Sequence, residues 1–382
     1  MGKCTQRKIL LNSIIVALLF SSNAITWVLN INNAIVMIMA FIVGLYMFCG
    51  NSLFPKYVLP LSFYVLVFFV MSLYIDGNNE TLQLYFLEFI LMGVVALIFS
   101  QVKIDVDTVI IALCFISIPV APFIMRIDFL GESNYGQWMG VSYGSIKFIV
   151  ALLYALCFIK MKKTLKILLI FPLIFYTVFF LSFGSRGAIV GVLTFIILAS
   201  LIKLGKSFIT NLTIVVSIIF LSIVFFLPMI NYLANLMGQL GIEFYAIDKI
   251  LAFADSERGI DNGRSERIVL GLSMFSDSPL WGNGIASFEK KFGIGYVHNL
   301  FVQQLVEGGI LLFIPLTIVL IKAVSIVLSN HYDSDVRMFL AFLICCNVVE
   351  LLFSNYCWRI QGYWYLIGYV LPYMRIKRKP NR

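Results

Sequence analysis

Long runs of apolar residues, separated by short polar breaks, occupy almost the whole chain from Ile9 onward. Most runs approach the roughly 20 residues that an α-helix needs to cross the hydrocarbon core of a bilayer. The breaks predict helices at approximately 9–29, 31–49, 57–75, 82–100, 106–125, 142–160, 165–183, 187–203, 208–228, 298–325, 337–355 and 359–374. The pattern therefore predicts an all-α fold, in which residues 1–382 form one polytopic bundle of about 12 transmembrane helices.

Composition agrees with a membrane protein. The chain is 61% hydrophobic and 12% charged, whereas a soluble domain is about half apolar and a quarter charged. The first apolar run follows Lys3, Arg7 and Lys8, as in a signal peptide, but it lacks a clear small-residue cleavage site and is taken as the first helix. The seven cysteines lie in or beside apolar runs without CxxC spacing, which favours buried thiols over disulfides or a metal site.

Lysine and arginine are distributed unequally between the connections. With the N-terminus inside, the cytoplasmic segments hold 18 of the 28 basic residues, including those of the tail at 375–382. Because cytoplasmic loops of membrane proteins are enriched in these residues, we expect a multi-pass protein of the cytoplasmic (inner) membrane with both termini in the cytoplasm. The net charge of +9 then reflects topology, not a nucleic-acid partner.

One connection, at 229–297, is much longer than the others and is predicted to lie on the outer side. Its interior mixes aromatic, acidic and basic residues. Loops of this length usually carry function or are disordered. We expect a small folded cap here.

Five ionisable residues are predicted at one depth, near the outer ends of their helices or in a break between two helices: Glu88, Lys147, Arg186, Glu307 and Glu350. A charge at the bilayer centre costs about 2.5–3.5 kcal/mol on insertion scales, so such groups normally face a protein interior or a wet cavity. The alternative, mainly for Lys147 and Glu88, is a side chain that reaches the lipid headgroups. A proton-coupled carrier would place its charges near the midplane, between discontinuous helices.

Two motifs contain paired glycines. In GSRG (184–187), Arg186 lies between two glycines and two apolar helices, and its guanidinium fork matches phosphate oxygens. The alternative is an arginine that meets lipid headgroups. In PLWGNG (279–284), Gly282 and Gly284 would allow a tight turn near a ligand.

The motif DNGRSER (261–267) carries two arginines that are three residues apart. If the chain is helical from Ser265 onward, Arg264 and Arg267 share one face. Asn262 or Ser265 is expected to cap this helix. The alternative is a solvated amphipathic face.

His298 lies in the motif VHNLFVQQLVEGG (297–309), and the other histidine, His331, lies in a predicted cytoplasmic loop. An imidazole with a pKa near 6.5 can accept a hydroxyl proton at neutral pH. The alternative is a histidine that caps or satisfies a helix end. Glu307 is nine residues further on, about 180° around a straight helix, so the two residues are not predicted to form a dyad.

In this order and spacing, the motifs resemble the O-antigen polymerase and O-antigen ligase superfamily over roughly residues 126–310. In that family, a glycan carried on a polyprenyl diphosphate is transferred outside the cytoplasmic membrane, with inversion. The resemblance implies that Arg186 and Arg264 bind the diphosphate and that His298 acts on the acceptor hydroxyl. Further candidates for substrate binding are Arg267, Glu307, Glu350 and Lys147.

The function expected from these observations is that of an oligosaccharide repeat-unit polymerase that needs no cofactor, because the scattered carboxylates Asp76, Asp128 and Glu132 form no obvious metal site. A ligase that uses a lipid A core as acceptor is the alternative within the family, and a lipid-glycan flippase or transporter is the alternative from another class. The expected partners are lipid-linked oligosaccharides as donor and acceptor, and membrane lipids. A chain-length regulator protein is a further candidate.

Overall fold

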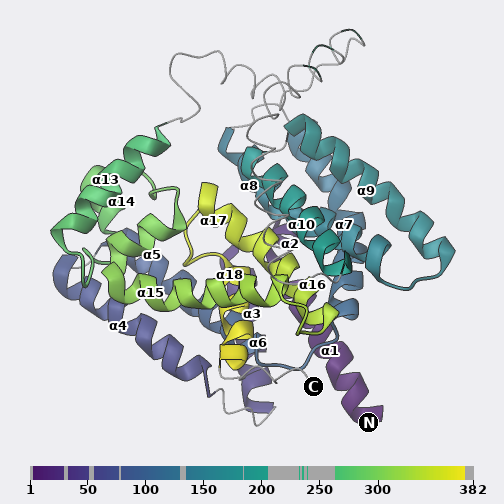
Figure 1. Cartoon of the computed structure of the whole chain (residues 1–382), viewed down its shortest axis with the longest axis horizontal. Helices are drawn as coiled ribbons and strands as arrows, with labels where there is room; N and C mark the ends of the chain where they lie inside the picture. Colours follow the sequence, from purple (N-terminus) through teal and green to yellow (C-terminus); the bar gives the residue numbers. More distant parts are fainter. Residues whose placement is uncertain are drawn as a thin grey trace. The chain divides into compact units, whose positions relative to one another are not determined.

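The computed structural model (Figure 1) describes residues 3–29, 33–50, 56–76, 79–129, 135–183, 185–204 and 263–374, with the single positions 232, 235 and 239. Helices are the regular structure that these residues form, which confirms the all-α prediction. Eight segments of them are long and apolar enough to cross a membrane: Val58–Ile75, Glu80–Phe99, Val106–Ile124, Gly140–Phe158, Lys163–Phe180, Gly187–Leu204, Leu300–Leu328 and Ser334–Phe353.

Each predicted helix is present except the one at 208–228, which lies outside the described residues. Six are uninterrupted: α3 (Asn33–Gly50), α4 (Val58–Asp76), α7 (Val106–Phe129), α8 (Tyr135–Phe158), α9 (Lys163–Phe183) and α10 (Arg186–Leu204). The first predicted helix is divided at Ser21 into α1 (Lys3–Phe20) and α2 (Ser22–Leu29). The last consists of α18 (Gln361–Val370) and the 3-10 turn η3 (Leu371–Met374).

Two predicted helices contain a turn of π-helix beside an acidic residue. One runs from α5 (Glu80–Glu88) through η1 (Phe89–Val94) into α6 (Val95–Phe99), and the other from α16 (Ser334–Leu343) through η2 (Ile344–Val348) into α17 (Val349–Phe353). Glu88 directly precedes η1, and Glu350 lies two residues after η2. Such insertions are rare within α-helices and frequent at functional sites.

The chain forms two compact units, each built from segments that are distant in sequence. The first comprises Met1–Val109, Gly263–Ser325 and Asn347–Arg382, and the second comprises Ile110–Asn262 and Ile326–Cys346. The core of the first unit is aromatic. The rings of Trp358 and Trp364 stack with their centroids 5.8 Å apart, and Phe69 meets Trp358 edge-on at 4.9 Å. α18, which carries Trp364, packs against α6 and η1, and most of its residues are buried.

In the second unit, α8 packs against α9 and α10, and α10 packs against α16. The buried Tyr176 on α9 donates its hydroxyl hydrogen bond to the Ser117 carbonyl on α7 at 3.0 Å. Its polar end is thereby satisfied within an apolar environment, as a buried tyrosine requires.

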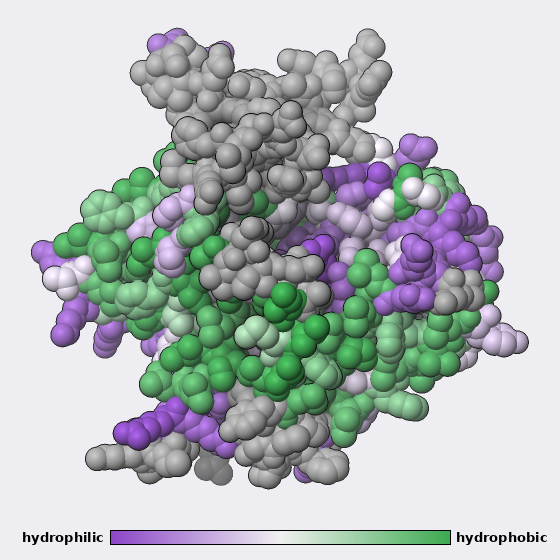
Figure 2. Space-filling view, turned by 180° about the vertical axis from the view of Figure 1, so that it is seen from behind, coloured by the Kyte–Doolittle hydropathy of each residue, from purple (hydrophilic) through white to green (hydrophobic). Residues whose placement is uncertain are grey.

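Large apolar side chains lie exposed along the helices, and Figure 2 shows hydrophobic residues over broad areas of the described surface. On α4 they recur every three or four residues, at Leu59, Phe63, Val67 and Val70. Soluble monomers rarely expose contiguous apolar patches larger than a few hundred Å². These faces are therefore suited to contact with lipid.

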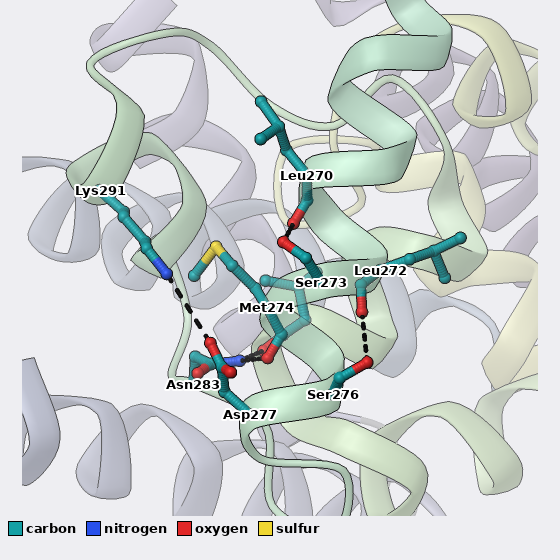
Figure 3. Close-up of polar contacts among 9 residues, drawn as sticks. Leu270, Leu272, Ser273, Met274, Ser276, Asp277, Asn283 and Lys291 are labelled. Atoms are coloured by element: carbon teal, nitrogen blue, oxygen red, sulfur yellow. Dashed lines mark hydrogen bonds and ion pairs between the residues drawn. The ribbon is translucent and has the colours of Figure 1, made fainter.

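The described part of the long connection is folded. α13 (Arg264–Asp277) and α14 (Ser287–Phe292) precede α15 (Leu300–Leu328), and an apolar cluster joins all three through Met274, Phe288, Val297, Val302 and Val306. Figure 3 shows polar contacts between α13 and the segment that follows it: Asn283 Nδ2 donates to the Met274 carbonyl at 2.7 Å, and Lys291 pairs with Asp277 at 3.8 Å. Residues 263–297, which we call the cap, thus fold and pack on α15, while the rest of the predicted 229–297 connection lies outside the described residues except for positions 232, 235 and 239.

Candidate active site

Arg264 and Arg267 occupy the first turn of α13, one turn apart, and both are half-buried. Gly263 holds the N-cap position with a φ of 73°, a left-handed conformation that glycine adopts without steric cost. Ser265 lies inside the helix and is not its N-cap, and the other predicted cap, Asn262, lies outside the described residues. The prediction of a helix that carries both arginines is confirmed.

The PLWGNG turn at 279–284 lies against a break in α15. At Gly309, a φ of 58° and a ψ of −159° interrupt the helix. A Cβ atom at Gly282 would lie 2.5 Å from the Gly308 nitrogen, so only glycine permits this approach. Backbone hydrogen bonds join the turn and the break: Asn283 N to Val306 O (2.7 Å), Gly284 N to Glu307 O (3.1 Å) and Ile310 N to Pro279 O (2.9 Å). The turn that was expected beside a ligand is thus seated on the backbone of α15.

The residue that caps α15 is Asn299. Its Oδ1 accepts hydrogen bonds from the backbone nitrogens of Phe301 at 3.0 Å and Val302 at 3.2 Å. His298, the preceding residue, has a left-handed φ of 62°. Such a conformation is uncommon for a residue with a side chain, and strained residues of this kind cluster at functional sites. The alternative in which His298 serves as the helix cap is therefore wrong.

The His298 imidazole is half-buried beside Tyr296, with the ring centroids 4.3 Å apart. It hydrogen-bonds to the backbone of Phe353, while its Nδ1 is buried and has no partner among the described residues. Burial, and then the positive charges of Arg267 and Arg264, lower the pKa of His298 to about 4. The imidazole is therefore neutral at neutral pH and has an unused nitrogen.

The GSRG motif separates α9 from α10, as predicted. Ser185 caps α10 through its hydroxyl and its carbonyl oxygen, which accept from the Ala188 nitrogen at 3.3 Å and the Ile189 nitrogen at 3.1 Å. Arg186 is the first residue of α10, and the position of its side chain lies outside the description. Lys147 is half-buried on α8. Both residues belong to the second unit, whereas His298 belongs to the first.

Comparison with protein families finds one similarity in this region. Residues 171–317 match the O-antigen ligase family. This segment is similar to proteins of the O-antigen ligase and polymerase superfamily. No curated protein shows significant similarity to it. The matched segment contains the GSRG motif, both arginines of α13 and the histidine, so the resemblance in sequence is confirmed for the residues that carried it.

Within the segment shared with this superfamily, Glu307 is 1% exposed and both of its carboxylate oxygens accept hydrogen bonds. Oε2 accepts from Trp358 Nε1 at 3.0 Å, and Oε1 accepts from Gln303 Nε2 at 2.9 Å. The Gln303 amide lies 3.3 Å from Glu289 Oε1 as well, so one side chain bridges two acids. Burial raises the pKa of Glu289.

Two further acids lie outside the segment that matches the superfamily. Glu350 Oε1 accepts from Asn355 Nδ2 at 2.9 Å and thereby holds the turn after α17, in which Asn355 has a φ of 64°. Glu88 pairs with Arg359 at 3.9 Å and accepts a hydrogen bond from the Tyr356 hydroxyl. The first unit thus gathers Glu88, Glu307 and Glu350, all predicted from hydropathy.

Sequence reasoning missed several polar and aromatic residues of this unit: Tyr85, Glu289, Tyr296, Gln303, Tyr356 and Arg359. The residues between α17 and α18 carried a usable signal, because FSNYCWRIQGYW (353–364) is unusually rich in aromatic and polar residues for a connection between apolar helices. Hydropathy alone assigned this stretch to two helix ends.

Proposed function

We propose that the chain is an oligosaccharide repeat-unit polymerase. It moves a glycan from a polyprenyl diphosphate anchor to the terminal sugar of another lipid-linked unit, at the outer face of the cytoplasmic membrane. The observation that carries the proposal is the environment of His298: a strained, neutral imidazole near two arginines, whose Nδ1 has no hydrogen-bond partner within the described part of the chain.

In the proposed reaction, the acceptor hydroxyl oxygen attacks the anomeric carbon of the donor sugar from the side opposite the diphosphate. The new C–O bond forms as the bond to the diphosphate oxygen breaks, and the hydroxyl proton passes to His298. A buried nitrogen without a hydrogen-bond partner is costly, and a bound hydroxyl would remove that cost. Glycosyl transfer proceeds through an oxocarbenium-like state, which acidifies the attacking hydroxyl, so a weakly basic imidazole suffices.

The arginines serve the leaving group in this scheme. A departing diphosphate accumulates negative charge, and fixed guanidinium groups stabilise such charge with bidentate hydrogen bonds. Arg264 and Arg267 already influence the electrostatics at His298. From the sequence motif, Arg186, at the positive N-terminal end of α10, is proposed to bind phosphate oxygens, and Lys147 is proposed to bind the substrate.

Glu307 and Glu350 support the site in this proposal by fixing its walls. Glu307 holds Trp358 and Gln303, and Glu350 holds the Asn355 turn that follows Phe353, the residue bonded to His298. In place of the direct substrate contact expected from the sequence, we assign both acids to positioning these neighbours.

One assay separates polymerase from ligase. The family that matches residues 171–317 is described as O-antigen ligase, which favours the ligase as the second candidate. Purified protein in detergent receives lipid-linked repeat units extracted from cells that lack this chain, with or without a lipid A core acceptor. The polymerase forms a ladder without the core and in the presence of a chelator. A product that requires the core would establish the ligase, and movement of lipid-linked glycan across vesicles without elongation would establish a transporter.

Orientation is part of the proposal and is testable in intact cells. An impermeant thiol reagent is expected to label Ser256→Cys, in the long connection, and to leave Ser207→Cys unlabelled. The reverse pattern would place the site on the cytoplasmic face and exclude transfer outside.

A further inference from the structure

Three tyrosines form a continuous row that starts at the His298 ring. Tyr296 lies 4.3 Å from His298, Tyr356 lies 5.7 Å from Tyr296, and Tyr85 stacks on Tyr356 at 4.2 Å with an interplanar angle of 27°. The distances join ring centroids. We call Tyr296, Tyr356 and Tyr85 the tyrosine row; its members come from the cap, from the connection between α17 and α18, and from α5.

Each hydroxyl of the tyrosine row is engaged by the protein. Tyr296 Oη lies 3.1 Å from Ser354 Oγ, and Tyr85 Oη donates to Glu289 Oε1 at 2.9 Å. The Tyr356 hydroxyl hydrogen-bonds with Glu88 and Arg359. The rings are therefore fixed in place before a ligand binds. Because their hydroxyl groups are already hydrogen-bonded, a ligand would contact the aromatic ring surfaces. A rigid side chain of this kind supplies contact area at little entropic cost.

Exposure distinguishes this row from the aromatic core of the same unit. Trp358, Trp364 and Phe69 are at most 1% exposed, whereas Tyr296 and Tyr356 remain half-buried, as does His298. The row also lies at the boundary of the apolar segments: Tyr296 precedes α15, and Tyr356 follows α17. The two rings nearest His298 are thus partly accessible.

From these observations, which rest on the proposed function, we infer that Tyr296 and Tyr356 form the acceptor subsite. They bind the non-reducing end of the acceptor saccharide by stacking on the C–H faces of its sugar rings and so direct its terminal hydroxyl to His298. Tyr85 and the Glu88–Arg359 pair are positioning residues that hold Tyr356. A pyranose has apolar faces and a polar rim, which matches rings whose own polar ends are already satisfied.

The test uses two readouts on the full-length protein. The acceptor probe is the glycan released by mild acid from the lipid-linked unit and labelled with a fluorophore at its reducing end. Its elongation by a fixed concentration of donor lipid gives an apparent KM, and its binding to the protein without donor is measured by saturation-transfer NMR. Tyr296→Leu and Tyr356→Leu are each expected to raise the apparent KM about two- to twelvefold and to weaken binding in parallel, since aromatic contacts contribute about 0.5–1.5 kcal/mol beyond burial.

Matched variants separate stacking from folding. Tyr296→Phe keeps the ring and should restore the wild-type KM, and Tyr74→Leu removes a tyrosine that is 93% exposed and should change neither readout. If Tyr296→Leu and Tyr356→Leu lower the melting temperature while KM and binding stay at wild-type values, the rings only anchor the fold and the inference is overturned. If the wild-type protein binds the released glycan through these rings but never elongates it, the subsite stands and the polymerase proposal fails.

Discussion

Two polar clusters lie nine residues apart along one segment and differ in almost every physical respect. Around Glu307, a closed cluster of Glu307, Gln303 and Trp358 is almost completely buried, and both carboxylate oxygens have donors. Around His298, an open cluster of His298, Arg264 and Arg267 combines positive charge, a strained backbone and a nitrogen without a described partner.

This contrast in hydrogen bonding indicates where chemistry can occur in this unit. A saturated polar cluster has no capacity left for a ligand, and its interactions contribute to stability and position. An unsatisfied cluster that is held by its surroundings has a cost in the empty protein that a substrate removes. Both clusters contain residues that were predicted from the sequence as site residues. Their hydrogen bonds indicate a structural role for the closed cluster and a role in substrate binding for the open cluster.

The largest expected effect concerns the open cluster. Asparagine at position 298 tolerates the left-handed backbone but cannot accept a proton near neutral pH. His298→Asn is therefore expected to slow chain growth by about 10²–10⁴ while the protein folds and binds donor normally. The polymer ladder and a thermal melt of the purified variant check this. A ladder at near wild-type rate would remove His298 as the base.

The closed cluster should respond in the opposite way. Glu307→Ala leaves the buried Trp358 donor without its acceptor, at about 1–3 kcal/mol, and leaves the Gln303 amide with only the longer contact to Glu289. We expect a clearly lower free energy of unfolding in detergent, and activity that follows the folded fraction. A variant that melts like the wild type but makes no polymer would show that Glu307 takes part in the chemistry, and the contrast between the clusters would fail.

Two glycines offer a matched comparison within the cap. Gly282 and Gly293 both have a left-handed φ, of 74° and 64°, but a Cβ at Gly282 would meet the backbone of α15, whereas nothing lies within 4 Å of one at Gly293. Gly293→Ala should therefore cost only the conformational strain, about 1–2 kcal/mol, and Gly282→Ala should cost more because α15 must shift. Thermal melts of both variants measure the difference; equal losses would mean that the turn is not seated on α15.

The smallest expected effect is a shift in pH dependence. Because the pKa of His298 is lowered to about 4, the neutral base persists through mildly acidic pH, and the acid limb of kcat/KM should lie near pH 4 instead of 6.5. Removing a positive charge in Arg267→Gln favours the protonated imidazole, so the pKa and the acid limb should move upward. Arg264→Gln should do the same to a smaller extent, because Arg267 contributes more. A limb that stays in place would exclude coupling between these residues.

Much of the fold was predictable because its signals are local. Apolar runs of about 20 residues, enough to span a bilayer, identify helices without knowledge of the neighbouring segments. The Gly-Ser-Arg-Gly sequence marks the end of α9 and the start of α10 by its composition alone. The helix that begins at Arg264 was predictable from its spacing, whereas its N-cap is Gly263, a residue without a side chain that could signal a cap.

What could not be predicted depends on contacts between distant segments. The fit of Gly282 against Gly308 joins two motifs that were noticed separately and given unrelated roles. The hydrogen bonds of Glu307 to Trp358, 51 residues away, follow no periodicity. The residues of the tyrosine row come from three elements, so no window of sequence contains them together.

The π-helical turn η1 determines the direction in which the side chains of Glu88 and Tyr85 project from their helix. Each such turn acts as one extra residue in the helix, and a single residue corresponds to about 100° of rotation. Glu88 and Tyr85 lie just before η1, while α6 after it packs against α18. Deleting one residue from 89–94 would restore regular α-helix and turn Glu88 and Tyr85 away from Arg359 and Tyr356, even with every contacting side chain unchanged. The direction of the Glu88 side chain thus depends on the number of residues in η1. Substitutions leave that number unchanged, so a substitution scan would not detect this dependence.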